Sequence, residues 1–242
     1  MDVKSDIPAK WKCLSGSWLK VIAMVSMLID HTAYFLLYYE EGMRDPLFVI
    51  GKTEFSVYFI LRTIGRLAFP LYCFLLVEGF IHTKNRLKYG INLLAFALIS
   101  ELPWNYAHCG AFLYNEQNVF FTLFFGYCGL CLVTYMEKHP LWEIVGVLAI
   151  LGITFVFKAD YGALGYAAIL AMYFLRQVPL VRAVVGIVLY DTTWRAGLAF
   201  VPIALYNGER GFIRGRIGKY VCYAFYPVHM LVLGLLKFGL PW

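Results

Sequence analysis

The stretch Ser17–Tyr39, SWLKVIAMVSMLIDHTAYFLLYY, decides the fold class of this chain. It is long enough to cross a bilayer as a helix, which takes about 20 residues. Asp30 and His31 lie well inside it, where an ionisable side chain costs roughly 2.5–3.5 kcal/mol on insertion scales. We therefore expect a membrane-spanning helix that carries a functional site. The alternative, that these charges only pair with other helices and hold them together, stays open.

The remainder of the chain has the same apolar character. Of its 242 residues, 61% are hydrophobic and only 15% are charged, whereas a soluble domain is about one quarter charged. The alternating ten-residue segments of a membrane β-barrel are not visible in the sequence. The composition predicts an all-α, polytopic integral protein of the cell membrane. We expect residues 1–16 to form a cytoplasmic N-terminal segment and residues 17–242 a single transmembrane domain.

We expect about eight to ten transmembrane helices. The candidates are residues 17–39, 56–82, 89–107, 118–136, 141–157, 161–176, 180–193, 196–207 and 219–239. The seventh and eighth are too short to span alone, and one long span is the alternative. The positive-inside rule favours two short helices and a cytoplasmic N-terminus, because a merged span would move Arg210–Lys219 to the outer side. The net charge of +6 then comes from a basic cytoplasmic rim, and no nucleic-acid partner is implied.

Polar residues of five segments should meet in the outer half of the membrane under this topology. They are His31, Arg66, Glu101, Asn118 and Asp160. Consecutive helical residues point about 100° apart, so we expect Asp30 to pair with Arg66, as a structural ion pair or as part of a catalytic site. An imidazole can transfer protons near neutral pH, and Glu101 or Asp160 would orient that of His31.

A second group of polar residues should lie nearer the cytoplasmic side. Glu78 and His82 are four residues apart and share a helix face. His229 lies near the middle of the last span, two residues after Pro227. The basic residues of the rim could hold the phosphates of an anionic nucleotide, or could serve topology alone. These residues are Lys84, Arg86, Lys88, Arg214 and Arg216. No spacing indicates a metal site.

Several of these motifs resemble those of the TraX family, and the resemblance runs from Leu19 over nearly the whole chain. The matching stretches are Leu19–Ala23 with Met27–His31, Gly65–Pro70 through Val77–Phe80, Ser100–Pro103, Asn118–Thr122, Leu205–Gly208 and Tyr223–His229. That family includes the pilin acetylase of conjugative plasmids. It is similar to a wider group of transmembrane acyltransferases that carry acetyl groups from cytosolic acetyl-CoA to acceptors on the far side.

The resemblance implies an integral-membrane acetyltransferase that uses acetyl-CoA and no metal. The acceptor would be an amine or hydroxyl on the extracytoplasmic side, such as a protein N-terminus or a sugar. His31 would be the general base or, as the alternative, a transient carrier of the acetyl group, with Asp30 beside it. Arg66 and Asn118 would stabilise the oxyanion, and Glu101 or Asp160 would assist His31. The coenzyme would be held by Glu78, His82, Lys84, Arg86, Lys88, Arg214, Arg216 and His229.

Two other functions fit the same residues. A proton-coupled transporter of small solutes would use the intramembrane acids, arginine and histidine as a proton relay, although the inverted repeats of many transporters are not visible here. A non-catalytic assembly factor would tolerate substitution of His31. The sequence leaves the acceptor and the oligomeric state open, and a homo-oligomer is compatible with it.

Overall fold

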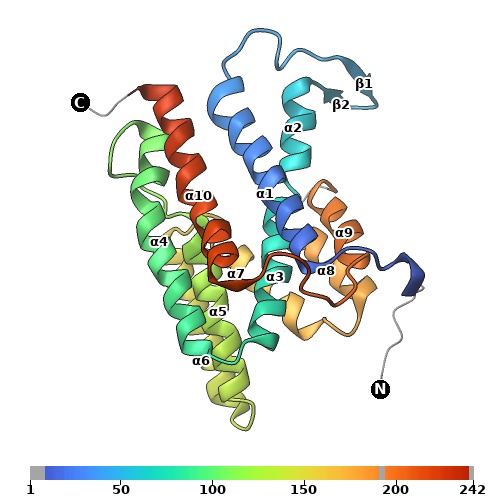
Figure 1. Ribbon diagram of the computed structural model, residues 1–242, viewed down its shortest axis with the longest axis vertical. Coiled ribbons are helices and arrows are strands. Elements are labelled where there is room, and N and C mark those ends of the chain that lie inside the picture. The colour runs from blue at the N-terminus through green and yellow to red at the C-terminus, as the bar shows by residue number, and fades with distance from the viewer. Residues whose placement is uncertain (1–8, 191–193, 240–242) are drawn as a thin grey trace.

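The computed structural model describes residues 9–190 and 194–239, and most of it is helical (Figure 1). The expected all-α fold is confirmed. The helices are α1 (Gly16–Thr32), α2 (Val57–Gly65), α3 (Ala68–His82), α4 (Arg86–Cys109), α5 (Val119–Tyr135), α6 (Pro140–Phe157), α7 (Gly162–Phe174), α8 (Pro179–Tyr190), α9 (Phe200–Ala204) and α10 (Gly215–Phe238), with a π-helical turn at Ala33–Leu37 and 3-10 turns at Ala9–Trp11 and Ala196–Ala199.

Four helical segments are long and apolar enough to cross a membrane, which agrees with a multi-pass membrane protein. They are Gly16–Leu37, Val57–His82, Pro140–Phe157 and Gly215–Phe238. Helices α5, α7 and α8 are apolar but shorter. At 1.5 Å per residue, the 13 residues of α7 measure about 20 Å, less than a hydrocarbon core of about 30 Å.

The eighth predicted span, residues 196–207, does not form one continuous helix. It consists of the 3-10 turn Ala196–Ala199 followed by the five residues of α9. The short helices expected around this point are therefore present. Residues 191–193, at the end of the seventh predicted span, lie outside the described residues.

Capping side chains fix where helices α2 and α4 begin. The Ser56 hydroxyl accepts a hydrogen bond from the Phe59 amide at the start of α2 (3.1 Å). Asn85 caps α4 by accepting from the Lys88 amide at 2.8 Å. These side chains satisfy amide donors that the first turn of a helix leaves unpaired.

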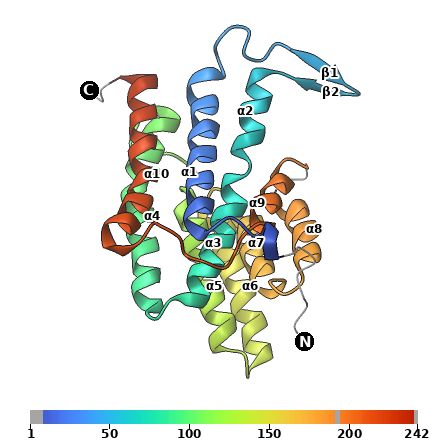
Figure 2. The ribbon, with the colours of Figure 1, turned by 45° about the vertical axis from the view of Figure 1, so that its right-hand side comes forward.

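Helices α4 and α10 lie side by side and run in the same direction (Figures 1 and 2). At their ends, the Tyr106 hydroxyl donates to the Gly239 carbonyl at 2.6 Å. Near their starts, the ammonium groups of Lys88 and Lys219 are close enough to repel each other. A parallel pair agrees with the topology expected for the third and ninth spans.

A short β-hairpin between α1 and α2 was not expected from the sequence. Strand β1 (Phe48–Ile50) pairs antiparallel with β2 (Thr53–Phe55), and Val49 faces Glu54 in the register. Gly51 opens the two-residue turn with a φ of +62°, a conformation that favours glycine at this position of a hairpin. The hairpin lies at the end of the molecule farthest from the α3–α4 turn (Figure 1).

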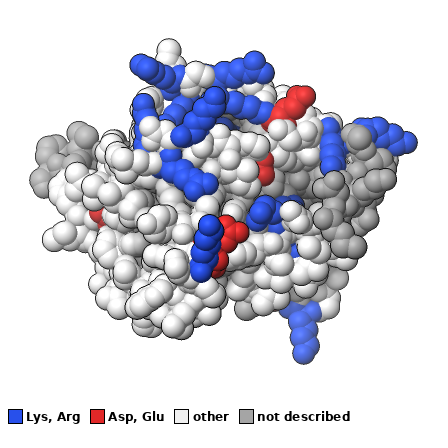
Figure 3. All heavy atoms as spheres, turned by 90° about the horizontal axis from the view of Figure 1, so that it is seen from below, with Lys and Arg blue, Asp and Glu red and all other residues white. Residues whose placement is uncertain are grey.

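Basic side chains gather on the face that carries the α3–α4 turn (Figure 3). The predicted phosphate-binding residues of this rim are all exposed: Lys84, Arg86, Lys88, Arg214 and Arg216. An excess of Lys and Arg is what the positive-inside rule requires of a cytoplasmic face. The charge distribution therefore supports the predicted orientation of the chain.

Candidate functional site

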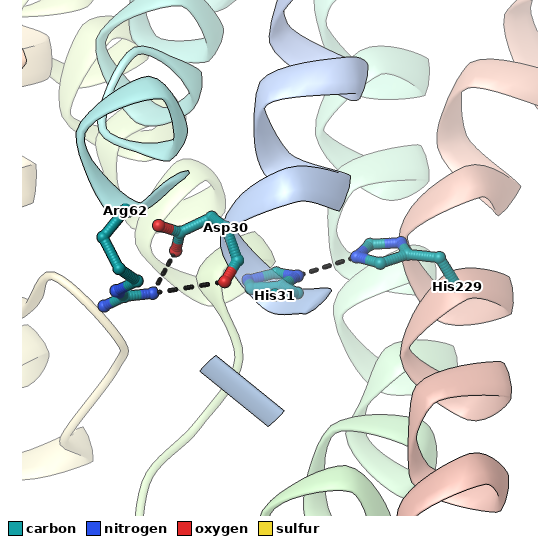
Figure 4. A network of polar contacts seen from close by, with 4 residues as sticks. All are labelled: Asp30, His31, Arg62 and His229. Atoms are coloured by element: carbon teal, nitrogen blue, oxygen red, sulfur yellow. Dashed lines mark hydrogen bonds and ion pairs between the residues drawn. The ribbon is translucent and has the colours of Figure 1, made fainter. Parts of the chain in front are cut away.

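Two histidines from distant parts of the chain meet inside the helical bundle. The Nδ1 atom of His31, on α1, lies 2.7 Å from the Nε2 atom of His229, on α10 (Figure 4). The two rings are nearly parallel, with an interplanar angle of 8° and centroids 5.0 Å apart. His229 is buried, so the contact lies within the protein. His229 was predicted among the coenzyme-binding residues, and the structure brings it to His31 instead.

The hydrogen bonds assign the tautomers of this pair. A carbonyl oxygen only accepts, so the Nδ1 atom of His229 donates to the Phe225 carbonyl at 2.7 Å. In a neutral His229 the Nε2 atom is then an acceptor, and the Nδ1 atom of His31 donates to it. The Nε2 atom of His31 keeps its lone pair. A general base takes a proton with such an atom.

The Asp30 side chain projects from a different face of α1 than the His31 ring, and it pairs with Arg62 of α2 (Figure 4). The Arg62 Nη1 atom lies 2.6 Å from Asp30 Oδ2, and both side chains are 15% exposed. The expected ion pair with Arg66 is therefore wrong. Arg62 precedes Arg66 by one helical turn, so the sequence spacing permits either partner. The chosen partner follows from how α2 packs on α1.

Gly65 makes this pairing possible. A Cβ atom at Gly65 would overlap the carboxylate of Asp30, because α2 passes α1 at very short range there. Arg66 follows as the C-terminal cap of α2, in the break before α3. Its charge acts on both Asp30 and Asp160, so Arg66 lies near two acids of the predicted site.

Glu101 and Asn118 meet each other, and neither orients His31. The Asn118 amide donates to Glu101 Oε2 at 2.6 Å and to the Ala97 carbonyl at 2.8 Å. Within the described residues, no hydrogen bond or ion pair joins His31 to Glu101 or to Asp160. The expectation that one of these acids orients the imidazole is thus wrong, because His229 occupies that position.

Asn118 is fully buried and acts as a structural cap of α5. Its side-chain oxygen accepts from the Phe120 amide at 3.1 Å, and both hydrogens of its NH₂ group are used on α4. An amide nitrogen carries only two hydrogens. In this arrangement Asn118 has no donor left for an oxyanion, contrary to the role that its motif implied.

Asp160 lies in the turn between α6 and α7, beside a pocket. The pocket measures about 370 Å³ and is lined by Asn115, Glu116, Lys158, Ala159, Asp160, Tyr161 and Gly162. Burial, assisted by the nearby Glu116 carboxylate, raises the pKa of Asp160 to about 7. The Asp160 amide donates to the Gln117 carbonyl at 2.8 Å, which places this turn at the start of α5.

The predicted inner residues lie apart from the histidine pair. Glu78 and His82 lie near each other on α3, with 3.5 Å between Oε2 and Nε2. Glu78 also faces Tyr206, and burial together with this carboxylate raises the pKa of Tyr206 to about 12. Arg214 donates to the Gly211 carbonyl at 2.8 Å, so it helps to fold the loop before α10.

The sequence reasoning missed two features of this site. Arg62 was not proposed as the partner of Asp30, although its position one helical turn before Arg66 made it an equal candidate. The pairing of His31 with His229 had no signal in the sequence. The two residues are 198 positions apart, and only the packing of α1 near α10 brings them together.

Comparison with known proteins identifies the family. The TraX protein family model matches residues 15–237. The chain is also 29% identical over 255 residues to the probable fimbrial assembly protein FimC, serogroup H1, of Dichelobacter nodosus, an alignment that covers 90% of this chain and 94% of that protein. No solved structure matches the chain significantly. The extent of the family match, with the motifs around His31 and His229 inside it, shows that this multi-pass membrane protein belongs to the TraX family.

Proposed function

We propose that this protein is an integral-membrane acetyltransferase that moves the acetyl group of acetyl-CoA to an acceptor on the extracytoplasmic side. The family match and the fimbrial assembly relative favour a pilin subunit as that acceptor, with its terminal amine or a hydroxyl as the reacting group. One observation carries the proposal. A buried His229 fixes the His31 ring so that its Nε2 atom presents a lone pair.

The reaction follows from this arrangement. The acceptor nitrogen or oxygen forms a bond to the carbonyl carbon of the thioester, and its proton passes to His31 Nε2. The carbon–sulfur bond then breaks, and the coenzyme A thiolate recovers the proton from His31. His229 is a positioning residue, because it holds the neutral ring in the correct tautomer and accepts from its Nδ1 atom throughout.

The coenzyme would approach along the contact between α1 and α10. Lys20 of α1 and Cys222 of α10 are close enough to interact, and Cys222 also acts on Tyr72 of α3. Cys222 and His229 are two helical turns apart on one face of α10. We therefore place the pantetheine arm here, with the phosphates on the exposed basic rim and the thioester beside His31.

Substitution of His31 tests the proposal. Purified His31→Ala and His229→Ala proteins are compared with wild type for transfer of labelled acetyl from acetyl-CoA to a pilin subunit. General-base catalysis contributes about 10²–10⁴-fold, so His31→Ala should lose at least about a hundredfold in kcat. His139→Ala is the matched control, because His139 is exposed in the α5–α6 turn. Wild-type transfer by His31→Ala contradicts the proposal.

Coenzyme A binding separates this enzyme from a transporter. A ligand that binds only the folded state raises Tm, so coenzyme A should stabilise the detergent-solubilised protein. Replacing Lys84, Arg86 and Lys88 together by Ser should weaken that stabilisation. A transporter of small solutes shows no shift with coenzyme A at any concentration.

A further inference from the structure

Tyr226 lies between the histidine pair and the start of α5. Its ring centroid is 6.1 Å from that of His31 and 5.6 Å from that of His229, and both contacts are edge-to-face. On its other side the ring meets Phe120, in the first turn of α5, with centroids 5.4 Å apart. Tyr226 thus extends from the proposed general base to the N-terminus of α5.

The hydroxyl of Tyr226 is hydrogen-bonded to no acceptor among the described residues, although the residue is only 3% exposed, and the group that approaches its oxygen is itself a donor, the Val119 N–H. Buried polar groups are nearly always paired, because an unpaired one forfeits its hydration without compensation. The neighbouring acids do not accept a hydrogen bond from this hydroxyl. Glu101 and Asp160 act on Tyr226 only through their charge, and Glu101 is hydrogen-bonded to Asn118. A buried O–H donor therefore stands ready for an acceptor from outside the chain.

A second donor lies beside it. Val119 is the first residue of α5, so its amide N–H has no carbonyl partner within the helix. The Asn118 side chain accepts a hydrogen bond from the next amide, that of Phe120, and not from the Val119 amide. The Val119 N–H is close enough to the Tyr226 oxygen to act on it. The α5 helix is 17 residues long, and its N-terminus carries a partial positive charge.

We propose that the Tyr226 hydroxyl and the Val119 amide form the oxyanion hole of the acetyl transfer. This assignment rests on the proposed function. Tyr226 would then be a catalytic residue with the role that the family resemblance implied for Asn118 and Arg66. Donors preorganised around a developing negative charge act strongly in a site that excludes water.

The step then balances as follows. When the acceptor atom bonds to the carbonyl carbon, the carbonyl oxygen becomes an oxyanion and accepts from Tyr226 Oη–H and Val119 N–H, while His31 holds the acceptor's proton. When the carbon–sulfur bond breaks, the carbonyl double bond re-forms and both donors are released. The thiolate leaves as coenzyme A with the proton from His31, and the acetylated acceptor departs.

The variant Tyr226→Phe tests this assignment, since it removes the hydroxyl and keeps the ring contacts. Loss of one oxyanion donor typically lowers kcat by about 10²–10³-fold. We expect that loss together with a little-changed KM for acetyl-CoA, an unchanged shape of the pH–rate profile, and a Tm equal to or above that of wild type. Tyr220→Phe on the exposed side of α10 is the matched control.

Two results would overturn the assignment. Wild-type kcat in Tyr226→Phe, while His31→Ala is inactive, removes Tyr226 from the reaction and leaves the proposed function intact. A Tm several degrees below wild type shows instead that the hydroxyl has a structural partner. Absence of acetyl transfer by the wild-type protein is a different outcome, because it contradicts the proposed function itself. Retained stabilisation of Tyr226→Phe by coenzyme A shows that the variant is folded and binds.

Discussion

At the scale of single residues, the site depends on which acids and bases touch. Two hydrogen bonds connect the Phe225 carbonyl to His229 and His229 to His31, and the Nε2 atom of His31 keeps a free lone pair. Asp30, next to His31 in sequence, belongs to a different contact and neutralises Arg62. Adjacent residues therefore make separate contacts: His31 meets His229 of α10, and Asp30 holds α1 to α2 through Arg62.

Asp160 gives a prediction about pH. Its pKa of about 7 lies above the ordinary value of 3.8, so between these values the folded protein binds a proton that the unfolded chain releases. The stability that this proton contributes is complete below about pH 4 and is lost as the pH rises through about 7. We expect the Tm of wild type to fall between about pH 4 and pH 7 and then to level off, and that of Asp160→Asn to fall less over the same range.

The comparison is made by thermal unfolding in detergent across that range. Glu116 raises the pKa of Asp160, and Arg66 opposes it, so Glu116→Gln should shift the transition to lower pH. Asp45→Asn, in the exposed loop before β1, is the matched control. If the Tm of wild type and of Asp160→Asn depends equally on pH, Asp160 is not the group that causes the pH dependence.

At the scale of elements, close approaches between helices set the geometry of the site. Gly65 at the end of α2 lets the Asp30 carboxylate lie against its backbone. Asn118 performs the same task between α4 and α5 through hydrogen bonds. These contacts fix the rotation of α1 and the position of the α5 N-terminus, and thereby where His31 and Val119 point.

The Asp30–Arg62 pair should contribute strongly to stability. Removing one partner of a buried ion pair costs about 3–5 kcal/mol, because the other charge remains unpaired. We expect Arg62→Met to lower the free energy of unfolding markedly, and the double variant Asp30→Asn with Arg62→Met to recover a large part of that loss. Urea titration followed by circular dichroism measures both, with exposed Arg44→Met as the control. If the double variant is no more stable than Arg62→Met, the two side chains do not act as a pair.

At the scale of the whole molecule, the two ends of the bundle differ in chemistry. One end carries the α3–α4 turn, on the face where basic side chains gather (Figures 1 and 3), and the other carries the β-hairpin and the C-terminal ends of α4 and α10 (Figure 1). The His31–His229 contact lies between these ends. This polarity fits an enzyme that takes a coenzyme from one side and an acceptor from the other.

Two exposed cysteines test the orientation. Cys13 precedes α1 and Cys109 ends α4, so they lie toward opposite ends of the bundle. In single-cysteine variants, a membrane-impermeant maleimide added to intact cells should label Cys109 and leave Cys13 unlabelled until the membrane is opened. Labelling of Cys13 alone would reverse the topology and place the basic rim outside.

The sequence by itself determined the fold class and the approximate span limits, and it placed His31 inside the first span as a candidate site residue. These properties follow from hydrophobic length, from the positions of Lys and Arg and from the cost of an ionisable group in hydrocarbon, all of which are local along the chain. The tertiary structure alone decided that His31 contacts His229 and that Asp30 pairs with Arg62. It also decided that both hydrogens of the Asn118 amide bond to α4. Partner choice depends on how each helix is rotated about its axis when it packs, and contacts between side chains nearly two hundred residues apart set that rotation.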